Sequence, residues 1–116
     1  MKRWTLAAAL LVMAPAAPAL AHHGWSSYDA AQVLEVKAPL QDVSWGNPHG
    51  TARVSFRGAT WDVVLAPTSR MESRGLTADM IGKGQTITLI GTPRSDGTKE
   101  MRIERVIVDG TTIELR

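Results

Sequence analysis

Apolar and polar residues alternate along most of the chain after Gln32, in short runs separated by glycine, proline and polar residues. A period of two is typical of a strand with one buried and one solvated face, and no stretch keeps a helical period. The clearest run is 51–57, where Ala52, Val54 and Phe56 alternate with polar residues. The pattern therefore predicts an all-β domain.

Five strands are expected, and a further run returns as a closing strand. The five ranges are 32–45, 51–57, 60–66, 85–91 and 99–108, and the closing strand is 111–115. Pro39 should bend the first strand, because proline has no N–H to give to a sheet. The alternation slips at Glu104-Arg105, which predicts a bulge. Turns are expected at Gly46 to Gly50, Gly58-Ala59, Asp96-Gly97 and Asp109-Gly110.

One short helix is expected between the third and fourth strands, over Ser69 to Arg74. Ser69 and Glu72 have the spacing of a capping box, and Gly75 follows at the end. A second short helix or turn is expected over 77–81. A long bent first strand and a helical insert in this place indicate a small OB-like, five-stranded Greek-key barrel.

The first 21 residues have the three parts of a cleaved signal peptide. Lys2 and Arg3 precede an apolar run over 6–13, and small residues end at Ala19-Leu20-Ala21. We favour cleavage after Ala21, with Ala19 as the alternative site, and expect export to the periplasm. The remaining 95 of 116 residues suit one small domain, with an N-terminal segment over 22–31 and the barrel over 32–116.

Charge and hydropathy exclude two classes of partner. Removing Lys2 and Arg3 leaves 11 basic against 11 acidic residues, so we expect no nucleic-acid partner, which would need clustered positive charge. No apolar run approaches the roughly 20 residues that cross a bilayer, so no membrane span is expected. Arg53, Arg57, Arg102 and Arg105 are expected on the solvated face of the sheet, balanced by Asp62, Glu100 and Glu104.

The three histidines, His22, His23 and His49, all lie outside the predicted strands. Cleavage after Ala21 would make His22 the first residue, and its free amine and imidazole Nδ1 can then chelate one metal ion. One further imidazole would complete a nitrogen site suited to Cu(II), the histidine brace. His49 is the preferred third ligand, because Pro48 stiffens its turn, and His23 is the alternative.

Neighbouring residues add to this hypothesis or compete with it. Asn47 could hydrogen-bond to a ligand, and Trp25 and Tyr28 could anchor the N-terminal segment onto the barrel. Zn(II) suits the site less, because the chain has no cysteine, although Asp29 could supply a carboxylate. Without a metal, the histidine pair would be an unstructured leader and His49 would cap a turn.

Several short motifs resemble one family of small exported bacterial proteins. They are HHGW at 22–25, Tyr28-Asp29, Asn47-Pro48-His49, Trp61, Arg74-Gly75-Leu76-Thr77 and Gly91-Thr92-Pro93. The chain is similar over its whole mature length to domain of unknown function family 6152. The resemblance implies export but no substrate and no catalytic residue.

The sequence leaves three functions open. The first is a periplasmic protein that binds copper for carriage or buffering rather than catalysis. The second is a non-enzymatic module that binds a protein or a saccharide without metal. The third, a mononuclear copper oxidase, would need an open coordination position and a reducing partner, which no motif indicates.

Overall fold

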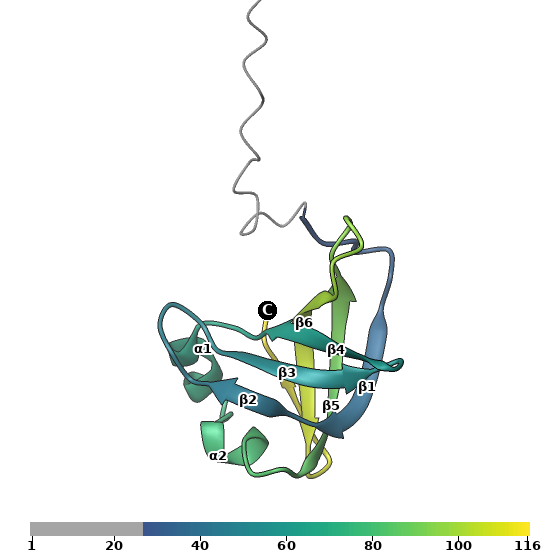
Figure 1. Cartoon of the computed structure of the whole chain (residues 1–116). Coiled ribbons are helices and arrows are strands. Elements are labelled where there is room, and N and C mark those ends of the chain that lie inside the picture. Colours follow the sequence, from purple (N-terminus) through teal and green to yellow (C-terminus); the bar gives the residue numbers. More distant parts are fainter. Residues whose placement is uncertain (1–26) are drawn as a thin grey trace, which may run out of the picture.

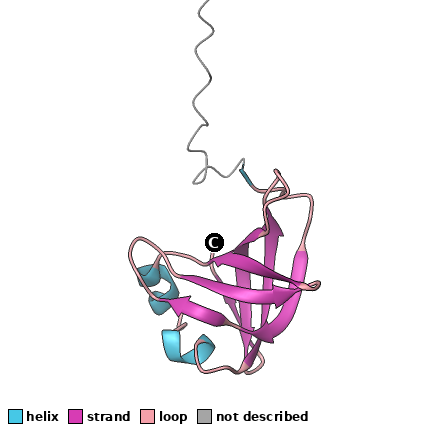
Figure 2. Ribbon diagram, in the orientation of Figure 1, coloured by secondary structure: helices cyan, strands magenta, loops and turns pink. Residues whose placement is uncertain are grey.

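The computed structural model describes residues 27–116, which form an all-β domain with seven strands and two short helices (Figures 1 and 2). The elements are β1 (Leu34–Pro39), β2 (Gln41–Ser44), β3 (Thr51–Phe56), β4 (Ala59–Val64), α1 (Thr68–Ser73), α2 (Ala78–Ile81), β5 (Thr86–Pro93), β6 (Glu100–Val108) and β7 (Thr111–Glu114). No helix in this part of the chain is long and apolar enough to cross a membrane.

A single sheet curls into a half-barrel (Figure 1). Its strand order is β1-β5-β6-β4-β3-β2, and β7 adds to β6. Neighbours run antiparallel except β4 and β6, which pair in parallel from Asp62 opposite Glu100. The first and last strands in this order, β1 and β2, are separated along the chain only by Leu40. The two edges of the sheet are therefore formed by one continuous segment.

The expected first strand is divided at its proline. Pro39 ends β1, which pairs with β5, and the chain then turns at buried Leu40 into β2, which pairs with β3. The bend is therefore confirmed. The structure has seven strands rather than five, because this division adds one strand to the expected five, and the expected closing run forms the seventh over Thr111–Glu114.

The inward faces of the strands and one side of each helix form one core. On the strands, Val54, Val63 and Ile103 are at most 1% exposed, and Met71 of α1 and Ile81 of α2 are fully buried in the same cluster. The alternation over 51–57 is confirmed, with Ala52 and Val54 buried and Phe56 partly buried. Helix packing therefore extends the strand core rather than forming a second one.

The expected bulge lies on β6 at Glu104. Ile90 of β5 is opposite Arg105 but its neighbour Gly91 is opposite Ile103, so Glu104 is the extra residue. This lets the inward series of Met101 and Ile103 resume at Val106. The slip in the sequence pattern is thus a bulge in the structure.

Two hairpins turn on pairs of residues with positive φ. The expected turn at Asp109-Gly110 has φ of 48° and 75° at these two residues. The twist of such a turn matches the twist of the flanking strands. In the β3–β4 hairpin the pair is Arg57 and Gly58, with φ of 50° and 75°. That turn lies one residue earlier than the expected Gly58-Ala59, because glycine takes the second of the two positions.

The first helix forms where expected but begins differently. Pro67 precedes it without a side-chain cap, and Glu72 accepts a hydrogen bond from the Trp45 indole at 3.0 Å. The predicted Ser69–Glu72 capping box is therefore wrong. The predicted end is confirmed: Gly75 has φ of 89°, and Leu76 N–H donates to the Met71 carbonyl at 2.9 Å, as in a Schellman motif.

Candidate functional site at one end of the barrel

The predicted site residues divide between described and undescribed parts of the chain. His22, His23 and Trp25 lie outside the described residues. Tyr28, Asn47 and His49 are described, with Tyr28 and His49 half-buried and Asn47 exposed. The structure therefore describes only those three of the six residues assigned to the proposed site.

The loop that carries His49 is fixed by its following glycine. Gly50 N–H donates to the Ala66 carbonyl at 3.0 Å, and Leu65 N–H donates to the Gly50 carbonyl at 2.9 Å. A Cβ at residue 50 would meet the Met71 side chain at 2.9 Å, so glycine permits this close approach. These two backbone hydrogen bonds hold His49 beside the end of β4 and the start of α1. The Asn47–Pro48 peptide just before it is cis.

The first described residues dock onto the β5–β6 hairpin through the backbone. Asp29 N–H donates to the Pro93 carbonyl at 2.8 Å, and Ser95 N–H donates to the Ser27 carbonyl at 2.9 Å. Tyr28 forms an isolated antiparallel bridge with Arg94 between these two bonds. The chain thus enters the domain as a short addition to this hairpin.

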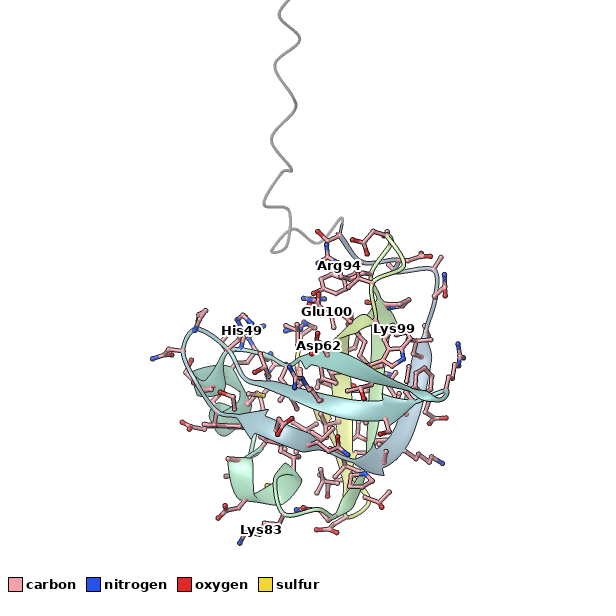
Figure 3. The ribbon with its side chains drawn as sticks, viewed as in Figure 1. His49, Asp62, Lys83, Arg94, Lys99 and Glu100 are labelled. Carbon is pink, nitrogen blue, oxygen red and sulfur yellow. The ribbon has the colours of Figure 1, made fainter. Side chains whose placement is uncertain are left out.

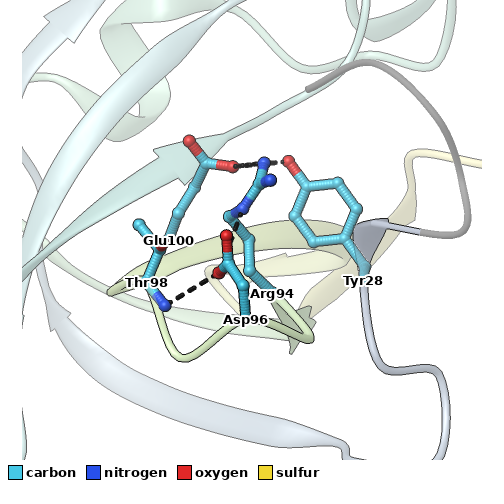
Figure 4. Close-up of polar contacts among 5 residues, drawn as sticks. All are labelled: Tyr28, Arg94, Asp96, Thr98 and Glu100. Atoms are coloured by element: carbon cyan, nitrogen blue, oxygen red, sulfur yellow. Dashed lines mark hydrogen bonds and ion pairs between the residues drawn. The ribbon is translucent and has the colours of Figure 1, made fainter. Parts of the chain in front are cut away.

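Side chains reinforce this docking (Figure 4). The Tyr28 hydroxyl donates to Glu100 Oε2 at 2.7 Å, and Arg94 donates to the same oxygen at 3.2 Å. The Arg94 guanidinium also lies 5.7 Å from the Tyr28 ring centre. We call Tyr28, Arg94 and Glu100 the latch, and the end of the barrel that carries them the latch end.

The electrostatics of the latch keep the phenol protonated. Burial, followed by the hydrogen bond to Glu100, raises the pKa of Tyr28 to about 12. The hydrogen bond to Glu100 also raises the pKa of Arg94. On the same hairpin, the backbone N–H of Thr98 lowers the pKa of Asp96. At neutral pH the latch therefore consists of a neutral donor, a cation and one shared carboxylate.

One arginine that the sequence assigned to the solvated face is largely covered. The Arg102 side chain is only 13% exposed and donates to Glu104 at 3.2 Å, whereas Arg53 and Arg105 are 57% and 45% exposed as expected. Arg116 is half-buried and donates to the Leu65 carbonyl at 2.8 Å. Burial, followed by the charge of Arg102, lowers the pKa of Arg116 to about 10. Sequence reasoning missed these neighbours because strand alternation alone does not show what covers an outward face.

The His49 loop and the latch lie toward the same end of the barrel. Leu65 N–H donates to the Gly50 carbonyl, and Arg116 donates to the Leu65 carbonyl, so the His49 loop lies next to the last residue of the chain. Figure 3 shows His49 and Arg94 toward one end and Lys83 at the other. Among residues 27–116, no three His, Cys, Asp or Glu side chains group to hold a metal ion.

A shallow polar groove lies on the outer side of β2, β3, β4 and β6, next to the latch. Its volume is about 410 Å³, and it is lined by Asp42, Thr51, Ala52, Arg53, Asp62, Val63, Val64 and Glu100. Arg53 bridges Asp42 at 3.6 Å and Asp62 at 3.4 Å across it. Glu100 belongs to both the groove and the latch.

Comparison with known proteins gives a family without an assigned activity. No curated protein matches the chain. The sequence profile of a family of unknown function, DUF6152, matches residues 9–102, which include the latch and the His49 loop. The chain therefore belongs to the DUF6152 family.

Proposed function

We propose that this protein is exported to the periplasm and binds Cu(II) there through an N-terminal histidine brace, for carriage or buffering. The His22 amine and imidazole would supply two nitrogens and His49 the third, with His23 as the alternative third ligand. The observation that carries the proposal is that the docked N-terminal segment and the His49 loop share the latch end.

The length of the intervening chain limits how far the His22 amine can lie from the hairpin. Five residue steps separate His22 from Ser27, which at about 3.6 Å per residue gives a reach of roughly 18 Å. Backbone hydrogen bonds fix Ser27 and Asp29 on the hairpin, so the reach starts from a fixed point. Docking of this kind lowers the entropy lost when an end of the chain closes on a ligand.

The donor chemistry favours copper among common metals. Imidazole and amine nitrogens in a square or T-shaped arrangement suit Cu(II), and the chain has no cysteine for a thiolate site. Asn47, two residues before His49, would be placed to hydrogen-bond to that imidazole or to a ligand water. The proposal therefore depends on a free amine at His22.

Intact-mass measurement of the exported protein, followed by Cu(II) titration, tests the proposal. We expect a first residue of His22 and a loss of affinity of more than about 100-fold in His22→Ala, because even groups that only hydrogen-bond to ligands account for 10–100-fold. His49→Ala and His23→Ala identify the third ligand by which of them weakens binding. A different first residue, or unchanged affinity in His22→Ala, would overturn the brace.

The groove supports a second candidate, a metal-free module that binds a periplasmic protein or a saccharide. Its lining of three carboxylates, one arginine, one threonine and three aliphatic residues offers several hydrogen-bonding groups and no aromatic platform. This function predicts that a variant lacking His22, His23 and His49 keeps its partner, and that Arg53→Glu loses it. Copper affinity that depends on His22 favours the first candidate.

We also propose that the half-barrel is of the OB type. Three features support this: the bent first segment pairs with both β3 and β5, β4 and β6 run parallel, and both helices fall between β4 and β5. Hydrogen exchange tests it by whether the backbone amides of β1 and β2 exchange as one unit, as expected if the two close the sheet as one continuous strand.

A further inference from the structure

One of the three methionines in residues 27–116 differs from the others in its surroundings. Met71 and Met101 are at most 1% exposed and belong to the core. Met80 of α2 packs against the same core but is only partly buried. Its thioether Sδ accepts a hydrogen bond from the backbone N–H of Thr77 at 3.4 Å, and this bond lies at the surface. Met80 is therefore the one of the three that solvent reaches.

The donor to this sulfur is the residue that precedes a helix. Thr77 has extended backbone, with φ of −116° and ψ of 160°, and Met80 is the third residue of α2. In a capping box this third position is held by glutamate or glutamine, whose side-chain oxygen accepts from the same N–H. A thioether sulfur is only a weak acceptor. An oxygen at the same place would therefore strengthen the hydrogen bond of Thr77.

Other contacts hold α2 in place around this bond. Gln85 Nε2 donates to the carbonyls of Asp79 and Met80 at 2.9 and 2.6 Å. The next residue of the helix, Ile81, is fully buried in the core. The backbone of Met80 is thus fixed by its neighbours, so a change at its sulfur acts on the bond from Thr77 rather than on the position of the helix.

We propose that Met80 is a site of reversible oxidation, at which hydrogen peroxide converts the thioether to a sulfoxide and the new oxygen takes over the hydrogen bond from Thr77 N–H. The sulfur loses two electrons and gains one oxygen, the O–O bond of the peroxide breaks, and its other oxygen leaves as water. Methionine Sδ has the same place along the side chain as Cδ of glutamine, so the sulfoxide oxygen stands where glutamine has its amide oxygen. Oxidation thus completes a capping box, whereas in a core it is disruptive.

Treatment of the exported protein with hydrogen peroxide, in the presence of a metal chelator, tests the site by peptide mapping. We expect Met80 to oxidise at least about tenfold faster than Met71 and Met101, because exposure governs the rate. Unfolding in urea should bring the three rates together. Oxidation of Met71 or Met101 as fast as that of Met80 in the native protein would overturn the proposal. The two stereospecific methionine sulfoxide reductases should restore the starting mass, and a product that they leave unchanged would overturn the reversibility.

Hydrogen exchange of the Thr77 amide tests the transfer of the hydrogen bond. This amide should exchange at least about threefold more slowly in the oxidised than in the reduced protein, because a stronger acceptor holds it. Unchanged or faster exchange would show that the sulfoxide oxygen does not accept from Thr77, and would overturn the proposal.

Two variants at residue 80 locate the effect. Met80→Gln puts an oxygen at the same place without oxidation, so it should slow Thr77 exchange as oxidation does and no longer respond to peroxide. Met80→Leu has a similar size but no acceptor, so Thr77 should exchange faster than in the reduced wild type. Equal exchange in the two variants would contradict the placement of the oxygen. The site is independent of the copper proposal, since Lys83, two residues after α2, lies at the end of the barrel opposite Arg94 (Figure 3).

Discussion

Gly91 of β5 lies so close to Arg102 of β6 that a Cβ at residue 91 would come within 2.3 Å of the Arg102 carbonyl oxygen. The contact is at the bulge, where Glu104 is the extra residue and the two strands shift register. The obstructing atoms are backbone, so a rotamer change cannot relieve the clash. Glycine at 91 thus lets the two paired strands approach closely at the bulge.

Gly91→Ala should therefore destabilise the protein strongly. We expect a loss of about 2–4 kcal/mol in the free energy of unfolding, the range for overpacking against an unyielding neighbour. Gly97→Ala on the same hairpin is the control. It has positive φ but no atom within 4 Å of the new Cβ, and should cost only about 1 kcal/mol. Urea unfolding of both variants gives the comparison, and equal losses would contradict the close approach.

The titration of Tyr28 reports the latch directly, because it is the chain's single tyrosine. Burial and the hydrogen bond to Glu100 raise its pKa from 10.0 to about 12, so phenolate absorbance should appear about two pH units later than in the unfolded chain. Glu100→Gln removes the negative charge and should lower this pKa, whereas Glu104→Gln should change it little. A midpoint near pH 10 in the native protein would show that the latch is open.

The same shift gives a stability change of known sign. Because the folded-state pKa lies above the unfolded value, the contribution is fully present below pH 10 and is lost as pH rises through 12. Unfolding free energy should therefore fall over this interval by more in the wild type than in Tyr28→Phe. If the unfolding free energies of the two proteins change in parallel with pH, the Tyr28 phenol contributes nothing to this pH dependence.

Docking of the N-terminal segment should depend on the latch carboxylate. Asp29 N–H and Ser95 N–H are the two backbone donors that join segment and hairpin, so their hydrogen exchange measures docking. In Glu100→Gln both should exchange faster, while buried amides of β5 such as that of Leu89 keep their rates. A uniform acceleration would indicate global destabilisation instead.

Periodicity predicted the strands, their inward faces and the β6 bulge because these features are local in sequence. Gly75 likewise predicted the end of α1, since the Schellman motif is made by adjacent residues. The capping box failed because Trp45, 27 residues earlier, takes the Glu72 carboxylate. Local propensity depends only on neighbouring residues, so it does not predict a hydrogen bond from a residue so far away in the sequence.

The candidate site was predictable only in part for the same reason. Tyr28 and His49 stood out because they lie in segments without strand pattern. The partners of Tyr28 did not, since Glu100 is 72 residues away and read as an exposed strand residue. Arg116 likewise donates to the carbonyl of Leu65, 51 residues earlier, which only the fold brings within hydrogen-bonding distance.

The two ends of α1 provide a final contrast between the expected and the observed helix. Ser69→Ala should change the unfolding free energy by less than about 0.5 kcal/mol, because no side-chain cap is lost; a working cap would be worth about 1 kcal/mol. Gly75→Ala should cost about 1–2 kcal/mol, because an L-residue must adopt the left-handed conformation that glycine holds at φ of 89°. Gly75→Asn should recover part of this loss, since asparagine tolerates that conformation. A larger effect of Ser69→Ala than of Gly75→Ala, measured by thermal or urea unfolding, would restore the capping box and contradict the hydrogen bond from Trp45 to Glu72.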